Sequence, residues 1–191
     1  MVMVHGRGAT AESILELASE FPEEGLAFVA PQALGHTWYP NSFLAPLATN
    51  EPWLSSALDV LGELCRTLES DGPTLERTIL LGFSQGACLA LEFAARNARR
   101  YGGVAALTGG LIGPEGTPRD YEGSLFGTPV FLGSSDRDPH VPLWRVEESA
   151  QVLSRMGASV TTRIYPGMGH TVNRDEVEAV REMVRGAVGQ G

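Results

Sequence analysis

Residues 78–100 read TILLGFSQGACLALEFAARNARR, and the rest of the chain can be placed around them. Residues 78–81 form a short apolar run with a β-branched start, which predicts a buried strand. From Gln85 onward, apolar residues recur at helical spacing at Leu89, Phe93 and Ala94. The stretch therefore predicts a strand, a sharp turn and a helix in immediate succession.

The turn itself, Gly82-Phe83-Ser84-Gln85-Gly86, fits the G-x-S-x-G pattern of a nucleophile elbow. In such a turn the serine backbone is strained so that its hydroxyl stands clear of the sheet, and small flanking residues let strand and helix approach. The five letters alone are weak evidence in a chain with 23 Gly. The strand before the turn and the alanine-rich helix after it are the setting that an elbow requires, so we interpret Ser84 as a nucleophile.

Size, charge and cysteine use narrow the class of protein. A chain of 191 residues has the usual size of one domain, and we expect a single domain over residues 1–191. Its formal net charge of -9 argues against nucleic acid as a partner, because nucleic acid attracts clustered Lys and Arg. No signal-peptide pattern or long apolar run is present, so we expect a soluble, cytoplasmic protein without integral membrane association. Cys65 and Cys88 fall in predicted helices, where we expect reduced, buried thiols. The sequence does not indicate the oligomeric state.

Short apolar strands alternate with amphipathic helices along the chain. Further strands are expected at residues 1–4, 26–30, 104–108, 130–133 and 159–165, the first of them central in the sheet. Helices are expected to begin near Thr10, Asn50 and Asn173, and another to span residues 143–156. This alternation predicts an α/β fold with a mostly parallel, doubly wound sheet covered by helices on both faces.

A long aromatic loop follows the predicted strand at residues 26–30. Residues 32–51 show no sustained period and contain Trp38 and Tyr39. Long aromatic loops in compact domains are usually functional, so we expect Trp38 and Tyr39 to bind substrate as part of a pocket wall or short lid. The alternative is that both rings only cover one edge of the core.

Polar side chains follow four of the predicted strands, where ligands gather in parallel sheets. These turns hold the His5-Gly6-Arg7-Gly8 segment, Ser84, Asp138 with Asp136 nearby, and His170. A serine hydroxyl needs a neighbouring base and a carboxylate that orients the base. The order Ser, Asp, His is that of α/β-hydrolases, so we predict Ser84 as nucleophile, His170 as general base and Asp138 as the orienting acid.

An oxyanion that forms at the substrate carbonyl also needs two hydrogen-bond donors. The backbone N–H of Gln85, directly after the nucleophile, is one candidate. The second candidate is the backbone N–H of Arg7, between two glycines in the first turn. In this interpretation the amide of Arg7 matters more than its guanidinium, which either meets an acidic substrate group or is solvated.

The four segments HGRG (5–8), GFSQG (82–86), DPHVP (138–142) and GH (169–170), in this order, resemble the phospholipase/carboxylesterase family, which includes the acyl-protein thioesterases. The resemblance implies a single-domain α/β-hydrolase with a minimal N-terminus, without the family's leading hairpin and without a large cap domain. It also implies a serine hydrolase that cleaves carboxylic esters or thioesters of small molecules or lipids through an acyl-enzyme, with no cofactor and no metal.

The resemblance carries the family's nucleophile to Ser84, its base to His170 and its oxyanion donors to Gln85 and Arg7. The D-x-x-V-P pattern selects Asp138 as the acid. Family members commonly place the acid three residues after the glycine that closes the strand, and that position is Asp136 here. We favour Asp138, because the helix that begins near Pro142 should hold it in place.

Other interpretations of the same residues compete with this one. A dienelactone-hydrolase-like lactonase on the same fold is one, although such enzymes typically use a cysteine nucleophile. A non-catalytic relative that binds a small ligand is another. The spacing of His36, His140 and Asp136 matches no metal-ligand motif. We expect His5 to hold its turn by hydrogen bonds and Cys88 to pack in the core.

Overall fold

A parallel sheet forms the centre of the molecule. The structure is a computed structural model and describes residues 1–189, so the last two residues of the expected domain lie outside it. Five strands pair in the order in which they occur along the chain. They are β1 (Val2–Val4), β2 (Ile79–Phe83), β3 (Gly103–Leu107), β4 (Pro129–Ser135) and β5 (Ser159–Tyr165).

Every neighbouring pair of strands is parallel, so all carboxyl ends lie at one edge of the sheet. The register pairs Val4 with Gly82, Phe83 with Leu107, and Leu107 with Gly133. Residues that follow these strands are thereby brought together. The predicted α/β fold class, with a mostly parallel sheet, is confirmed.

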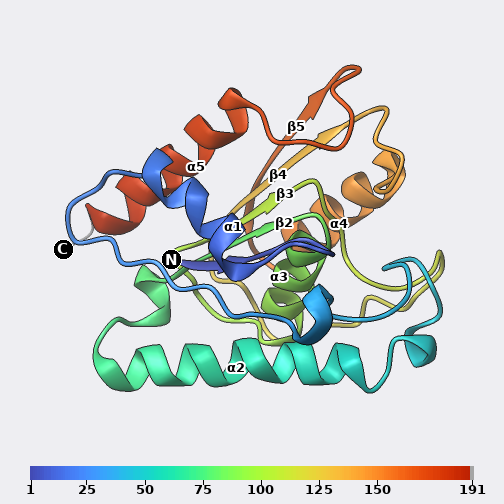
Figure 1. Cartoon of the computed structure of the whole chain (residues 1–191), viewed down its shortest axis with the longest axis horizontal. Coiled ribbons are helices and arrows are strands. Elements are labelled where there is room, and N and C mark those ends of the chain that lie inside the picture. The colour runs from blue at the N-terminus through green and yellow to red at the C-terminus, as the bar shows by residue number, and fades with distance from the viewer. Residues whose placement is uncertain (190–191) are drawn as a thin grey trace.

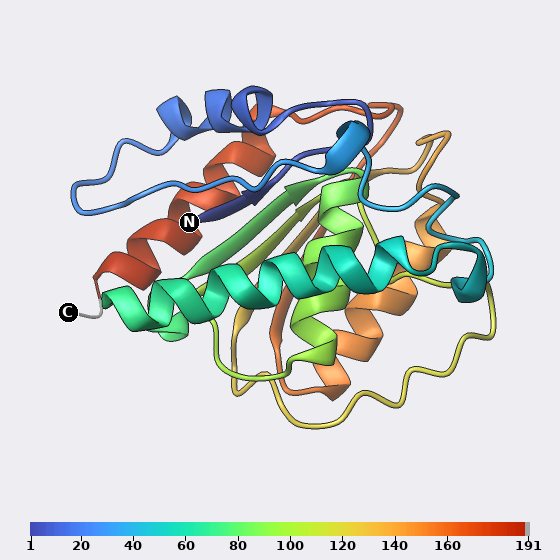
Figure 2. The same cartoon turned by 60° about the horizontal axis from the view of Figure 1, so that its bottom comes forward.

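Helices cover both faces of the sheet (Figures 1 and 2). On one face lie α2, α3 and α4, and on the other lie α1 and α5, with the 3-10 helix η1 continuing α1. The helices are α1 (Ala11–Leu15), η1 (Glu16–Glu20), α2 (Trp53–Asp71), α3 (Gln85–Arg96), α4 (Leu143–Arg155) and α5 (Arg174–Val188). Capping boxes begin α1 at Thr10 and α5 at Asn173, as their sequences predict.

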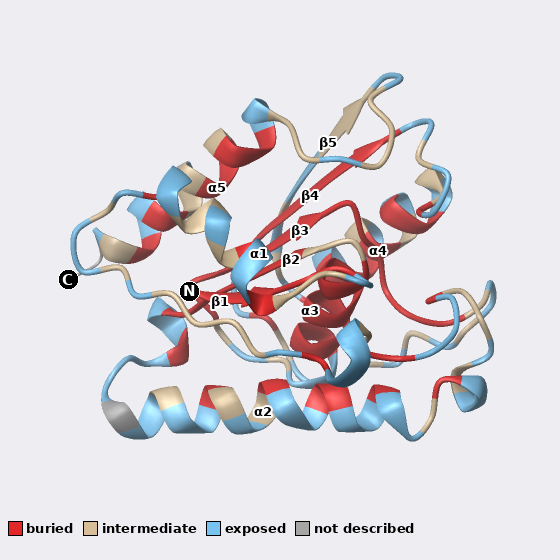
Figure 3. Ribbon diagram, in the orientation of Figure 1, coloured by how far each residue is buried: buried red, intermediate tan, exposed pale blue. Residues whose placement is uncertain are grey.

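The two faces have separate apolar cores because strand side chains alternate. In β2, Leu80 packs with α2, α3 and α4, whereas Ile79 and Leu81 pack with α1 and α5. Figure 3 shows the inner strands and α3 in the colour of buried residues, while α2 is buried only along the side that faces α3. Within residues 1–189, no helix combines the length and the apolar composition needed to cross a membrane.

Two expectations about the first sheet edge are wrong. Residues 26–30 form no strand, and only Val29 makes a bridge, to Val2. β1 therefore lies at the edge of the five-stranded sheet rather than at its centre. Two backbone hydrogen bonds join Val29 to Met1 and Met3. The pairing stops there because β1 has three residues and Pro31 has no N–H to donate.

A smaller correction concerns the start of α2. Asn50 was expected to open this helix, but the helix begins at Trp53 and its N-cap position is Pro52. The side chain of Asn50 is buried and instead links the preceding loop, since it accepts from the backbone N–H of Asn41 and donates to the carbonyl of Ser42. The asparagine closes a loop instead of capping a helix.

Candidate active site

Ser84 lies in the strained turn between β2 and α3. Its φ of 56° and ψ of -118° fall where L-residues rarely occur. A Cβ atom at Gly82 would collide with the backbone of Gly86, and one at Gly86 would collide with the carbonyl of Val4. The glycines of the G-x-S-x-G pattern are therefore required by the close approach of α3 to β1 and β2.

The structure brings Ser84, His170 and Asp138 into one chain of hydrogen bonds. His170 Nε2 lies 2.8 Å from Ser84 Oγ, and His170 Nδ1 lies 2.7 Å from Asp138 Oδ2. The Asp138 side chain is fully buried, while 19% of the His170 side chain is exposed. A buried carboxylate bonded to Nδ1 leaves Nε2 as the nitrogen that can accept a proton from the serine.

Asp138 and Asp136 hold different parts of this region. Asp138 Oδ1 accepts from the backbone N–H groups of His140 and Val141, at 2.7 and 2.9 Å, just before α4. Asp136 Oδ1 accepts from the backbone N–H of Gly167, in the turn that leads to His170. Asp138 therefore contacts the imidazole, and Asp136 supports the turn that carries it.

The turn after β1 lies directly against the elbow. A Cβ atom at Gly6 would be 3.4 Å from the Cβ of Ser84. The backbone N–H groups of Arg7 and Gln85 donate no hydrogen bond to any atom of residues 1–189. Gln85 begins α3, and the first N–H groups of a helix have no partner within it. Both predicted donors are thus available near Ser84.

His5 is buried behind this turn and has an assignable tautomer. Its Nε2 accepts from the backbone N–H of Ala33 at 3.1 Å, so the proton is on Nδ1, which donates to the carbonyl of Gly6 at 2.7 Å. His5 therefore holds the turn by hydrogen bonds, in the way the sequence indicates.

A cavity of about 460 Å³ opens beside Ser84. Its walls come from the first turn, residues 39–43, the elbow, Cys88 and the segment with His140 and Val141. Both Trp38 and Tyr39 are buried, but only Tyr39 is among the lining residues. The indole N–H of Trp38 donates to the carbonyl of His5. The alternative interpretation, that the ring covers the core, describes Trp38 better.

The guanidinium of the exposed residue Arg7 makes contacts that neither of its two expected roles includes. Nη1 donates to the carbonyl of Pro40 at 2.9 Å, and Nη2 donates to the carbonyls of Tyr39 and Asn41 at 2.9 and 2.6 Å. The side chain is thus bound to the aromatic loop. Its three partners are backbone carbonyls, and the spacing of residues in the sequence could not indicate these contacts.

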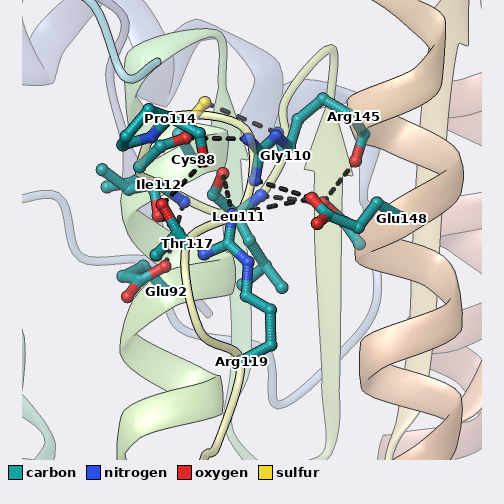
Figure 4. Close-up of polar contacts among 12 residues, drawn as sticks. Cys88, Glu92, Gly110, Leu111, Ile112, Pro114, Thr117, Arg119, Arg145 and Glu148 are labelled. Atoms are coloured by element: carbon teal, nitrogen blue, oxygen red, sulfur yellow. Dashed lines mark hydrogen bonds and ion pairs between the residues drawn. The ribbon is translucent and has the colours of Figure 1, made fainter. Parts of the chain in front are cut away.

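Arg119, Arg145 and Glu148 form a largely buried ionic cluster (Figure 4). Arg145 and Arg119 both reach Glu148, at 2.7 and 3.6 Å. Arg145 also donates to the carbonyl of Gly113, whose N–H donates to the carbonyl of Phe43 in the cavity wall. This cluster is not predicted from the sequence, where the Arg-x-x-Glu spacing on α4 is its one local signal.

A thiol, that of Cys88, also lies close to the candidate site. Burial raises the pKa of the Cys88 thiol to about 12, so this thiol stays protonated and unreactive at neutral pH. Cys88 lies in the cavity wall and accepts a long hydrogen bond from Gly110. No group of three His, Cys, Asp or Glu side chains suited to a metal ion occurs in the described part of the chain.

Several known proteins are similar to this chain in sequence. A family model described as phospholipase/carboxylesterase matches residues 1–187. Acyl-protein thioesterase 1 of Gibberella zeae is 32% identical, over 58% of this chain and 48% of that protein. Acyl-protein thioesterase 1 of Debaryomyces hansenii is 27% identical, over 73% of this chain and 70% of that protein. The chain thus matches about half the length of the first relative.

Solved structures extend the likeness to the whole fold. A phospholipase/carboxylesterase from Dyadobacter fermentans is 46% identical, with a TM-score of 0.92 over 96% of this chain and 88% of that one. SOBER1 of Arabidopsis thaliana shares the fold at 18% identity, with a TM-score of 0.81 over 98% and 97% of the two chains. Because the family model covers nearly every residue, the chain belongs to the phospholipase/carboxylesterase family.

Proposed function

We propose that the protein is a serine hydrolase that cleaves carboxylic esters or thioesters through an acyl-enzyme on Ser84. The observation that carries the proposal is the unbroken chain of hydrogen bonds from Ser84 Oγ through His170 to the buried Asp138. Names of the relatives, which include carboxylesterases and acyl-protein thioesterases, support the same class of bond.

In this mechanism His170 Nε2 takes the proton of Ser84 as Oγ bonds to the substrate carbonyl carbon. Asp138 keeps the imidazole oriented and stabilises its positive charge. The protonated His170 then gives its proton to the leaving alcohol or thiol as the bond to the acyl group breaks. A water molecule repeats the sequence on the acyl-enzyme and releases the acid.

The backbone N–H groups of Arg7 and Gln85 are proposed to bind the oxyanion of the tetrahedral intermediate. Each donor of this kind is worth about 3 kcal/mol of barrier in serine hydrolases. This role is supported because neither N–H donates a hydrogen bond within residues 1–189. Arg7 and Gln85 also line the same cavity as Ser84.

The cavity supports a small acyl or alcohol group as substrate, with Tyr39 in its wall. A volume of about 460 Å³ lies near the small end of the range for ligand pockets. Trp38 is proposed to support this wall from behind rather than to contact substrate. The choice between ester and thioester, and a cytoplasmic location, stay predictions.

The test replaces the nucleophile. We expect Ser84→Ala to lower the turnover of p-nitrophenyl acetate by about 10⁴-fold or more, because the acyl-enzyme has no other oxygen on which to form. A fluorophosphonate probe should label the wild type and fail to label this variant. Ser55→Ala, on the exposed side of α2, serves as the matched control and should keep wild-type rates.

Retained turnover in Ser84→Ala would overturn the proposal. An unlabelled and inactive wild type would instead favour the non-catalytic relative. Faster cleavage of lactones than of linear esters, with Ser84 still required, would favour the lactonase.

A further inference from the structure

One backbone oxygen connects the two residues whose amides face the proposed oxyanion. The carbonyl oxygen of Tyr39 accepts from Arg7 Nη2 at 2.9 Å and from Gln85 Nε2 at 2.9 Å. Arg7 follows β1 and Gln85 begins α3, so these residues belong to different elements. A carbonyl oxygen has two lone pairs and can accept both bonds at once.

Arg7 binds this loop with more than one bond. Its guanidinium donates to three successive carbonyls, those of Tyr39, Pro40 and Asn41. A planar guanidinium presents several donors in a fixed arrangement, which the single ammonium of a lysine cannot reproduce. The Arg7 side chain therefore fixes the position of the loop relative to the first turn.

Gln85 binds the same loop with both ends of its amide. Its Oε1 accepts from the backbone N–H of Trp38 at 3.0 Å, while its Nε2 donates to the carbonyl of Tyr39 at 2.9 Å. The residue is 6% exposed, so these bonds are shielded from water. A carboxylate or an apolar side chain of the same size could not make this set of bonds.

From this geometry we propose that the side chains of Arg7 and Gln85, joined through the carbonyl of Tyr39, are positioning groups that set the distance between the two oxyanion donors. The inference rests on the proposed serine-hydrolase function. Oxyanion stabilisation depends on donors placed in advance, and small displacements of such groups lower the rate strongly. Through its two hydrogen bonds, the Tyr39 carbonyl thus keeps the turn after β1 and the start of α3 in a fixed relative position.

The test begins with Arg7→Met, which removes the guanidinium and keeps an unbranched side chain. We expect kcat for p-nitrophenyl acetate to fall by about 10-fold or more, because one donor moves away from the oxyanion. KM should change by less than about 2-fold, since the ground state makes little use of these donors.

A trifluoromethyl ketone separates positioning from general damage to the site. Ser84 Oγ adds to its carbonyl carbon while the serine proton passes to His170, and the resulting oxyanion occupies the donor site. Its inhibition constant should rise by the same factor by which kcat falls. A variant with lower kcat and unchanged inhibition by this ketone would overturn the proposal.

Arg7→Lys separates the effect of the planar guanidinium geometry from the effect of the positive charge. It keeps the positive charge and loses the fixed set of donors, so we expect it to behave like Arg7→Met. Wild-type kcat in Arg7→Lys would overturn the proposal, because the charge alone would then be sufficient. This variant also serves if Arg7→Met fails to fold.

A double-mutant cycle tests the shared oxygen. Gln85→Met alone should also lower kcat, and the double variant should lose less than the product of the two single losses, because both bonds position the same loop. Independent losses would overturn the coupling through Tyr39. Arg100→Met is the matched control, because it removes a guanidinium bond to the carbonyl of Phe126 in a different loop and should keep wild-type kcat.

These outcomes do not decide whether the proposed serine-hydrolase function is correct. If the fluorophosphonate probe labels Ser84 in every variant and Ser84→Ala is inactive, the hydrolase assignment stands whatever Arg7 does. If Ser84→Ala is active, the hydrolase assignment fails first.

Discussion

Two sides of the candidate site are built in different ways. On the oxyanion side, residues 5–8, 37–41 and Gln85 are joined by the guanidinium of Arg7, the side-chain amide of Gln85 and the indole N–H of Trp38. The histidine side, residues 134–142 with residues 166–176, depends on carboxylates: Asp138 and Asp136 accept from their neighbours, and Glu176 accepts from Asn173.

The difference follows from what each side has to do. Oxyanion donors act through their fixed position, and the amide of Gln85, the guanidinium of Arg7 and the indole of Trp38 keep the same charge at any moderate pH. An imidazole that gains and loses protons needs a negative charge beside it. We therefore expect the histidine side to respond to charge and pH, and the oxyanion side to respond to the loss of hydrogen-bond geometry.

The largest expected effect tests the histidine side. Asp138→Asn should lower kcat by about 10⁴-fold, because an asparagine neither stabilises the imidazolium nor selects the same tautomer. Asp136→Asn should cost less than about tenfold, since its amide oxygen can still accept from Gly167. Both variants are measured with p-nitrophenyl acetate at one pH.

Equal losses in the two variants, or a larger loss in Asp136→Asn, would reassign the acid to Asp136. Asp136→Asn is itself the matched control, because both substitutions remove one carboxylate from the same loop.

A second prediction concerns the pH response of stability. Glu176 is fully buried against Gly133, and burial raises the pKa of this carboxyl to about 7 from an ordinary value of 4.5. Between these two values the unfolded chain releases a proton that the folded chain retains, so the free energy of unfolding falls as the pH rises from about 4.5 to 7. Across this window the free energy of unfolding falls by about 3 kcal/mol.

Glu176→Gln should remove most of this pH dependence, and Gln preserves the capping pattern at the start of α5. Urea unfolding at pH 5 and pH 8 measures the change, with Glu182→Gln on the exposed side of α5 as control. A variant that loses as much stability between pH 5 and pH 8 as the wild type would contradict the role of Glu176.

The smallest expected effect tests the oxyanion side. Trp38→Phe removes the indole N–H that donates to the carbonyl of His5, a bond of 2.8 Å between buried residues. We expect a loss of about 1–2 kcal/mol in the free energy of unfolding, because the His5 carbonyl is left without its partner. The loss should be equal at pH 5 and pH 8.

Trp53→Phe is the control for this substitution, since Trp53 is 54% exposed. A loss for Trp38→Phe that differs between pH 5 and pH 8 would remove the contrast between the two sides.

Much of the fold could be predicted from local patterns. Residues 159–165 were predicted as a strand and form β5, and Asn173 with Glu176 was predicted as a capping box and forms one. The exception at residues 26–30 has an apolar pattern, but a strand also needs a partner of matching length, and β1 is too short to provide one. Pairing partners lie outside any local window.

The candidate site could also be predicted only in part. Ser84, Asp138 and His170 were selected from the sequence, and the three side chains are hydrogen-bonded in the structure. The role of the Arg7 guanidinium and the position of Trp38 were not predictable. Arg7 reaches a carbonyl 32 positions away, and a backbone oxygen has no signature in the sequence.

The amino-acid sequence by itself determined the alternation of strands and helices and the glycine-flanked turn at Ser84, because these depend on neighbouring residues and on the lack of a side chain at Gly82 and Gly86. Only the tertiary structure decided which aspartate contacts His170 and how one carbonyl joins Arg7 to Gln85. Such contacts depend on how separate segments pack in three dimensions, and distance along the chain does not specify that packing.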